Sequence, residues 1–408
     1  MTIEDRQAMP PTAVSPLDAE PLVTLAAQST GSTNSWRIWL ACFGLWLAPA
    51  ATVSVSPIMN SVAMDARTLT EAQIGMVRTL EILLNAGLTI WLSLRLGKLH
   101  PRPLGLFGLG LLAVGNFASA FGTELGALIA ARLAAGAGAA CVMSAGSALV
   151  ARIKSPQRLI GGLAIPITAI GVVSAIIAGQ LVATQGQIGA FGPIAVASLF
   201  AIPFVVFAPA RLQSAVSPRV DTLLGSVAHP YVLASAACYF GSTAVWTFFA
   251  RIALALDYDA AQVGYIIAGV SVGAGLMGAL GALARDRWVR PAVLIAIVVF
   301  GACYIIVPLA PSIPDSGTLF IAAFAVACVC YALMQNFFTV VAVRLDRTGA
   351  LNAAGNGWAS LANALAPWTA GALITASGSF APLAVMTGGA AVATFILLWI
   401  AMRSMPDS

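Results

Sequence analysis

The sequence consists of apolar runs of about 20 residues separated by short polar segments. A helix of that length spans the roughly 30 Å hydrocarbon core of a bilayer. No run alternates apolar and polar residues in the way that a membrane β-barrel requires. The pattern therefore predicts an all-α integral membrane protein. Its twelve expected spans are 38–60, 72–94, 103–121, 125–150, 159–184, 188–209, 230–254, 261–283, 291–311, 317–342, 351–376 and 381–402.

The polar segments divide these spans into two groups of six. The first residues are polar and rich in Pro, Ser and Thr, without the basic region and short apolar core of a signal peptide. We therefore expect a disordered cytoplasmic tail there. The expected organisation is a tail at 1–35, a six-helix bundle at 36–210, a cytoplasmic linker at 211–229, a second six-helix bundle at 230–403 and a cytoplasmic tail at 404–408.

Two segments of the first half recur in the second half. Thr70–Gly75, before the second span, resembles Asp259–Gly264, before the eighth. Each has a Thr or Asp followed three residues later by Gln, a capping-box pattern that predicts the start of a helix. Residues 178–181, Ala-Gly-x-Leu, resemble residues 370–373. Repeats of this kind indicate pseudo-symmetric halves with a solute site between them near the membrane midplane.

Composition supports this picture and excludes others. The chain is 60% hydrophobic and 9% charged, whereas a soluble domain is about 25% charged. Most Lys and Arg residues follow the even-numbered spans and only Arg67 lies on the opposite side, so the positive-inside rule places both termini in the cytoplasm. The net charge of +5 forms no basic stripe, and we expect no nucleic-acid partner. The six cysteines lack the spacing of a zinc site, and we expect no metal and no cofactor.

A more specific signal lies in the fourth span. The pattern Leu128-x-x-x-Arg132-x-x-x-Gly136-x-Gly138 resembles the fourth-helix signature of the major facilitator superfamily (MFS), with Ala135 where that family usually has Gln. The resemblance implies a carrier whose two bundles rock about a central site. No phosphate-binding Gly-Lys-Ser/Thr loop and no nucleophile–base pattern is present, so we expect neither ATP-driven transport nor an enzyme.

The loops after the second and eighth spans carry a related resemblance. The segment 95–98, Arg-Leu-Gly-Lys, is similar to the end of the family's cytoplasmic loop motif, with Leu94 in place of its Asp, and the segment 281–287 is its pseudo-symmetric counterpart. The resemblance implies that these loops control the change of conformation. The residues expected in that role are Arg95, Gly97, Lys98, Asp286 and Arg287.

Glu81 is the one carboxylate expected deep inside a span. Charges at bilayer depth are costly and are usually retained for function. Arg78 lies on the same helix face three residues earlier, and Arg132 is expected at a similar depth. Three roles remain open for this group: a proton-coupling site, a permanent ion pair that locks the first bundle, and direct contact with the solute. The family associates the fourth-helix Arg with proton coupling, which favours the first role by resemblance.

The resemblance also implies that spans one, four, seven and ten line the solute pathway. Each aromatic residue there has core packing as its alternative role. Gln335 and Asn336 are adjacent, so only one of the two is expected to face the pathway centrally. The candidate solute-binding residues are Trp46, Asn60, Tyr239, Trp246, Tyr331, Gln335, Asn336 and Arg251.

Arg251, near the outer end of span seven, is either an interface anchor or a contact for an anionic solute. Counted over the spans, three arginines oppose one carboxylate, a bias that favours a carboxylate-bearing or aromatic anion. We therefore expect proton-coupled uptake of such a solute by a monomer in a bacterial-type inner membrane. The alternative is proton-coupled efflux of an amphipathic compound. The expected partners are the solute, the proton and the lipid bilayer.

The orientation leads to the first testable prediction. Lys98 and Lys154 should face the cytoplasm, because both lie in basic loops. In a variant without its native cysteines, Lys98→Cys and Lys154→Cys should react with a membrane-impermeant thiol reagent only after the cells are opened. Labelling of either position from outside intact cells would overturn the topology.

Overall fold

The computed structural model describes residues 35–93, 95, 100–150, 156–209, 228–281, 288–346 and 350–403. Over these residues the chain forms twelve long α-helices and one short 3₁₀ turn. Their bounds are α2 (Ser35–Arg67), α3 (Glu71–Ser93), α4 (Pro101–Phe121), α5 (Leu125–Val150), α6 (Pro156–Gln185), α7 (Gln187–Val205), α9 (Pro230–Leu254), α10 (Ala260–Gly281), α11 (Val289–Leu309), η4 (Ala310–Ser312), α12 (Gly317–Leu345), α13 (Ala350–Ser377) and α14 (Ala381–Arg403).

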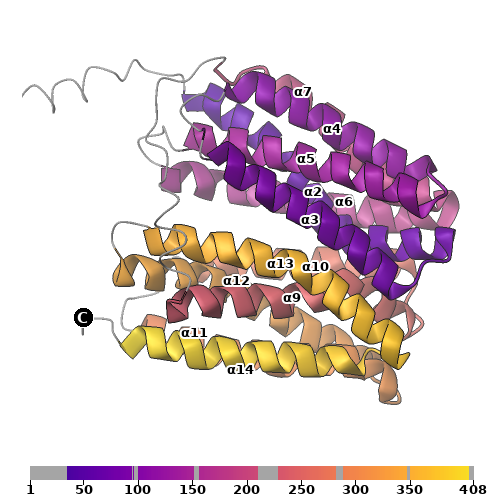
Figure 1. Cartoon of the computed structure of the whole chain (residues 1–408), viewed down its shortest axis with the longest axis vertical. Coiled ribbons are helices and arrows are strands. Elements are labelled where there is room, and N and C mark those ends of the chain that lie inside the picture. Colours follow the sequence, from indigo (N-terminus) through magenta and orange to yellow (C-terminus); the bar gives the residue numbers. More distant parts are fainter. Residues whose placement is uncertain are drawn as a thin grey trace, which may run out of the picture.

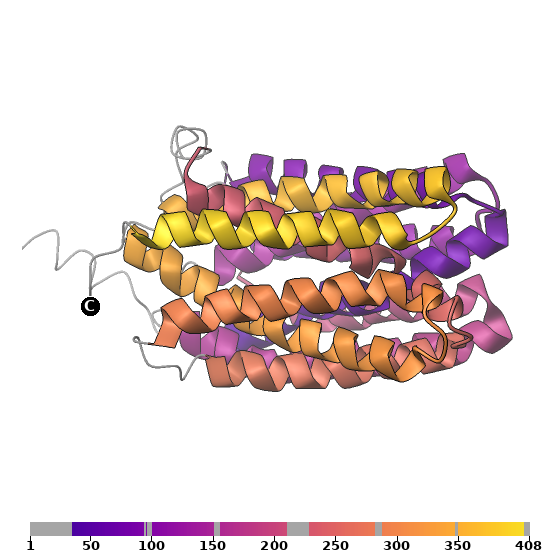
Figure 2. The same ribbon diagram turned by 90° about the horizontal axis from the view of Figure 1, so that it is seen from below.

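The helices run side by side between two ends of the molecule (Figure 2). Figure 1 shows α2–α7 on one side and α9–α14 on the other, and we call these groups the N-half and the C-half. We call the end where α2 begins and α3 ends the inner end, and the opposite end the outer end. The two groups converge at the outer end and diverge toward the inner end (Figure 1). The N-terminal tail, the greater part of the linker and the C-terminal tail of the expected organisation lie outside the described residues.

Eleven of the twelve helices are long and apolar enough to cross a membrane. The exception is α13, which contains Asn352, Asn356 and Asn363 and is expected from the sequence as span eleven. Two of its asparagines are bonded to α9: Asn363 Oδ1 accepts a hydrogen bond from Thr243 Oγ1, and Asn352 Oδ1 accepts one from the Tyr231 hydroxyl. The twelve-helix prediction is confirmed, and the polarity of α13 reflects its place between α3 and α9 rather than in a fully lipid-exposed position.

Both predicted capping boxes are present. At the start of α3 the backbone N–H of Thr70 donates to Gln73 Oε1 (2.9 Å) and the N–H of Gln73 donates to Thr70 Oγ1 (3.3 Å). At the start of α10 Asp259 and Gln262 exchange the equivalent bonds, at 2.8 and 2.7 Å. Each box satisfies two N–H groups that a helix start leaves unpaired.

The second sequence repeat is explained by two glycine crossings that join the halves. In α3, Gly75 packs on the carbonyl of Pro367 in α13, while Gly371 of α13 packs on the carbonyl of Glu71. A Cβ at either glycine would collide with that backbone. Because these helices approach so closely, small residues are required at the contact.

The symmetry-related crossing joins α6 and α10. A Cβ on Gly179 would lie 2.6 Å from the carbonyl oxygen of Ala260, and one on Gly264 would lie 2.6 Å from that of Ala175. Both crossings are therefore close contacts of one backbone against another, in which no flexible side chain can move aside. They occupy the outer part of the molecule, near the starts of α3 and α10.

Hydrogen bonds strengthen both crossings. The N–H of Ala72 donates to Thr375 Oγ1 (3.0 Å), and the N–H of Trp368 donates to Thr79 Oγ1 (3.1 Å). At the other crossing Gln180 Nε2 donates to the hydroxyl of Tyr265 (2.7 Å). The structure is therefore one in which the halves are closed on each other at the outer end.

The glycine crossings predict a sharp difference between two substitutions in α3. Gly75→Ala should destabilise the outer closure by about 1–3 kcal/mol, the usual cost of overpacking, because the added methyl meets the Pro367 carbonyl. Gly87→Ala is the matched control, since nothing lies within 4 Å of its Cβ position. It should be neutral or stabilising by about 0.5–1 kcal/mol. Equal melting temperatures for the two purified variants would contradict the crossing.

Candidate functional site

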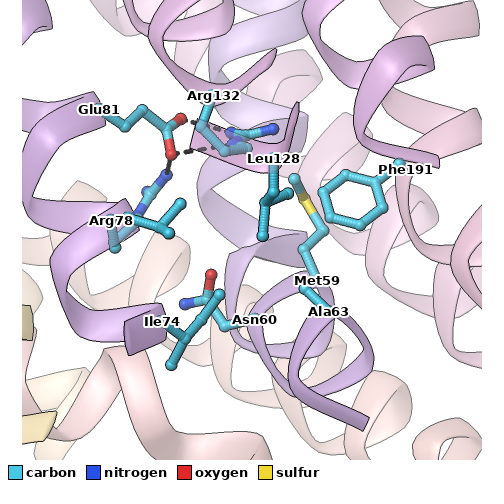
Figure 3. A pocket seen from close by; sticks show the side chains of 10 residues that line it. Met59, Asn60, Ala63, Ile74, Arg78, Glu81, Leu128, Arg132 and Phe191 are labelled. Carbon is cyan, nitrogen blue, oxygen red and sulfur yellow. Dashed lines mark hydrogen bonds and ion pairs between the residues drawn. The ribbon is translucent and has the colours of Figure 1, made fainter. Parts of the chain in front are cut away.

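Glu81 lies inside the N-half between two arginines (Figure 3). Its side chain accepts from Arg132 Nε (3.0 Å) and, through the other oxygen, from Arg132 Nη2. Arg78 Nη1 lies 2.7 Å from Glu81 Oε2. Glu81 is 6% exposed and Arg132 4% exposed. The structure thus brings together in direct contact the three residues that the sequence places at one depth.

The local packing of α3 on α5 makes this contact possible. Gly136 lies one helical turn after Arg132, and a Cβ there would be 2.5 Å from the carbonyl oxygen of Glu81. The absent side chain lets the two helices approach until the Arg132 fork spans both carboxylate oxygens. Arg132 and Gly136 of the fourth-helix signature therefore act together. Arg132 binds the Glu81 carboxylate, and the missing side chain at Gly136 makes room for the Glu81 backbone.

Asn116 of α4 is a partner that the sequence analysis missed. Its Oδ1 accepts from Arg132 Nη1 (2.9 Å), and its Nδ2 donates to the Leu112 carbonyl (2.8 Å). Asn116 is fully buried in a helix of apolar and small residues. A single Asn in such a helix was the available signal, because a buried amide requires hydrogen-bonding partners.

A small cavity adjoins the carboxylate. Its volume is about 10 Å³, about the space that one water molecule occupies. Figure 3 shows its walls, which come from α2, α3, α5 and α7. Phe191 of α7 closes it, with the Arg132 guanidinium carbon 5.8 Å from the ring centre. The lining residues are Met59, Asn60, Ala63, Ile74, Val77, Arg78, Glu81, Leu128, Arg132 and Phe191.

Asn60 connects this cavity to the C-half. It is 8% exposed, and its Nδ2 donates to the Thr247 carbonyl of α9 (3.2 Å). One to two turns earlier in α2, Trp246 Nε1 of α9 donates to Ser56 Oγ (3.1 Å) and to the Val53 carbonyl (3.3 Å). Two of the candidate solute-binding residues, Asn60 and Trp246, thus lie at the contact between the halves.

Arg251 has a partner that changes the charge count. Its Nη1 lies 2.6 Å from Asp65 Oδ1 of α2, which forms a partly exposed ion pair across the halves. Asp65 lies beyond the predicted first span, 38–60, and is therefore missing from the charges counted over the spans. With Arg251 neutralised by Asp65, the expected excess of two positive charges falls to one, contributed by the two arginines around Glu81.

Arg67 also lies elsewhere than the sequence analysis expects. It belongs to α2 and is 9% exposed instead of lying in an outer loop. Its Nη2 donates to the carbonyls of Ser119 (2.8 Å) and Gly122 at the end of α4. A cation there compensates the unpaired carbonyls and the negative end of the helix dipole. The predicted first span, 38–60, is therefore too short, and α2 continues through Arg67.

The remaining solute candidates fall into two places. In the C-half, the Tyr239 hydroxyl donates to Gln335 Oε1 (3.1 Å), and the Tyr239 and Tyr331 rings pack edge to face at 6.2 Å. Asn336 turns away from this group and donates to the Gly278 carbonyl of α10 (2.8 Å). Trp46 lies apart from it, in the N-half against Gly146 of α5.

Of the expected gating residues the structure describes only Arg95. It is exposed and lies over the Trp91 ring, with the guanidinium carbon 3.9 Å from the ring centre. Gly97, Lys98, Asp286 and Arg287 lie outside the described residues. Within the described ranges no group of three or more His, Cys, Asp or Glu side chains could hold a metal ion.

Comparison with known proteins identifies the fold. No protein-family model matches the sequence, and no curated protein matches it either. Among solved structures, the crystal structure of the nucleoside transporter NupG is similar, with a TM-score of 0.67 and 13% sequence identity. The similarity covers 90% of this chain and 98% of that one. The chain therefore has the MFS fold, and eleven of its described helices are long and apolar enough to cross a membrane, in agreement with the predicted fold class.

The buried cluster predicts how arginine substitutions differ. Arg132→Ala leaves Glu81 and Asn116 without their shared partner and should cost about 3–5 kcal/mol of stability, as for a broken buried ion pair. Arg132→Lys should recover only part of this, because lysine lacks the planar fork. Arg251→Ala breaks a partly exposed pair and should cost about 1 kcal/mol or less. Thermal unfolding of the purified proteins checks the order, and equal losses at both positions would contradict it.

Proposed function

We propose that this protein is a secondary active transporter that moves a small organic solute by proton-coupled alternating access. The observation that carries the proposal is the Glu81 carboxylate, buried between Arg78 and Arg132 beside a cavity that Asn60 links to the C-half. The MFS fold supports the alternating-access part, since it provides two halves that meet across a central plane.

The Glu81 cluster offers a physical route from proton to movement. Two arginines stabilise the ionised carboxylate. Protonation removes the charge that holds them, so Arg78 and Arg132 lose their anchor and the packing of α3 on α5 weakens. Because Asn60 lines the same cavity and bonds to α9, that change reaches the contact between the halves. The permanent-ion-pair role makes the opposite prediction, that Glu81 stays ionised through the whole transport cycle.

We infer the solute class from the aromatic side chains of α9 and α12 and from the charge of the Glu81 cluster. Trp246 stacks with Phe249 and Phe324, and Tyr239 and Tyr331 add hydroxyl groups. These side chains suit a planar ring, and the excess positive charge of the Glu81 cluster favours a carboxylate on it. We therefore propose an aromatic or carboxylate-bearing solute. Nucleosides, which NupG transports, also have planar rings and belong in the same screen.

The proposal also covers assembly, membrane, orientation and direction of transport, and the charge distribution supports the orientation. The protein acts as a monomer in a bacterial-type inner membrane with both termini in the cytoplasm, and the solute moves inward with protons. Gating by the loops that contain Arg95, Lys98, Asp286 and Arg287 belongs to the same proposal. In vesicles, the direction of solute movement separates the two alternatives. If protons that move inward down their gradient drive the solute outward, the efflux alternative replaces uptake.

Glu81→Gln tests the coupling. The solute is first chosen, among aromatic carboxylates and nucleosides, as one that raises the melting temperature of the purified protein. Glutamine keeps the shape of the protonated side chain, so the variant should still exchange labelled for unlabelled solute in vesicles. It should lose accumulation driven by a proton gradient.

Glu124→Gln is the matched control, because Glu124 is exposed in the turn before α5, and it should accumulate solute like the wild type. Full accumulation by Glu81→Gln would end the proton-coupling proposal. Exchange, accumulation and melting temperature falling together would instead assign Glu81 the role of a permanent ion pair.

A further inference from the structure

The inner parts of α3 and α13 carry polar residues that the proposed site leaves unused. Asn85 and Thr89 lie one turn apart in α3, and Thr89 Oγ1 donates to Asn85 Oδ1 (3.3 Å). Asn356 and Ser360 lie one turn apart in α13, and Ser360 Oγ donates to the Asn356 carbonyl (2.8 Å). Neither bond uses the Asn356 amide, for which the described residues provide no partner. We call Asn85 and Thr89 the α3 stripe, and Asn356 and Ser360 the α13 stripe.

The outer crossing fixes the height at which these residues lie. α3 and α13 are antiparallel, with Gly75 on Pro367 and Glu71 on Gly371. Eleven residues further inward on each helix, this register brings Asn356 to the level of Ala86, beside Asn85. Asn85 is eight residues from the inner end of α3, about 12 Å at 1.5 Å per residue. The two amides therefore lie at the same depth, below the surface of the membrane.

The stripes point away from lipid. Leu365 of α13 is exposed and lies nine residues after Asn356, which places the two side chains on opposite faces of the helix. In α3 the exposed apolar residues Leu84 and Trp91 line an open groove on one side. Asn85 and Thr89 lie on the other side, in line with Arg78, which is about two turns from Asn85 and three turns from Thr89 toward the outer end. A polar residue on that side of a spanning helix faces a protein interior or water, not acyl chains.

The exposure of side chains on this face of α13 shows whether they face water or protein. On the outer part of α13, Pro367 and Ile374 share the central face with Asn356 and are buried, and the Pro367 carbonyl lies against Gly75 of α3. Asn356 itself is exposed, at the inner end where the halves diverge (Figure 1). Within the Glu81 cluster, Arg78 is the most exposed side chain, 15% against 8% for Glu81 and 5% for Arg132. The exposed edge of the cluster is thus the one in line with the α3 stripe.

We propose that Asn85, Thr89, Asn356 and Ser360 line an aqueous passage that connects Arg78 and Glu81 with the inner face of the membrane. Hydroxyl and carboxamide groups along it hold water and the polar group of the solute. The inference rests on the proposed function for its use, as the route by which the proton of Glu81 and the solute leave. Its geometry is independent of that function.

Thiol labelling tests the passage without measuring transport. Asn85→Cys and Asn356→Cys are made in a variant whose native cysteines are replaced by alanine. Both should react with the charged reagent sulfonatoethyl methanethiosulfonate, applied to membranes with the inner face accessible, because a thiolate forms only in contact with water. Leu84→Cys and Leu365→Cys, on the lipid-facing sides of the same helices, are the matched controls and should react at least tenfold more slowly.

Thr89→Cys and Ser360→Cys replace any stripe variant that is not monodisperse after purification. Stripe positions that react no faster than Leu84→Cys and Leu365→Cys would overturn the passage. Fast labelling together with full proton-driven accumulation by Glu81→Gln would leave the passage standing and remove only the proton-coupling function.

Discussion

The N-half is organised by the need to pair one buried carboxylate. An ionised side chain that is removed from water is stable only if hydrogen bonds and opposite charge replace its hydration. Glu81 meets this need with Arg132 from α5 and Arg78 from its own helix, and Asn116 of α4 holds the far side of Arg132. Three helices are thereby fixed to one another by a single charge. A change in that charge would alter their packing, and for this reason we propose the position for proton coupling.

A second constraint, close backbone contact, fixes where the halves meet. Four glycines form two symmetry-related crossings at the outer end, each with carbonyl groups pressed against a position that lacks a Cβ. Such contacts are either made or broken, because backbone cannot yield as a side chain does. The Glu81 cavity lies next to this closed region through Asn60, whereas the polar stripes of α3 and α13 extend away from it toward the inner end. The molecule thus has a closed outer end, a buried charge and two polar stripes arranged along its length.

Much of this could be predicted from the sequence, because the relevant signals are local. Span length fixes the helices, the Thr70–Gln73 and Asp259–Gln262 pairs fix two helix starts, and a lone deep carboxylate marks Glu81. Pairings between distant helices could not be derived in this way. Two such pairs are Asp65 with Arg251 and Asn116 with Arg132. They depend on the relative rotation of helices, which the spacing of residues along the sequence does not reveal. For the same reason the repeat around Gly179 and Gly371 was visible, but its role in joining the halves was not.

The central claim is that Glu81 changes its protonation state during transport, and infrared difference spectroscopy measures this directly. Purified protein in lipid is compared at high and low pH in the presence of a transported solute. A protonated carboxyl group has a carbonyl stretching band that is distinct from the bands of a carboxylate. The other Asp and Glu side chains give such bands in both proteins. The account predicts one further band, from Glu81, that appears in the wild type as the pH is lowered and is missing from Glu81→Gln. A wild-type protein that transports solute while its spectrum matches that of Glu81→Gln at every pH would contradict it.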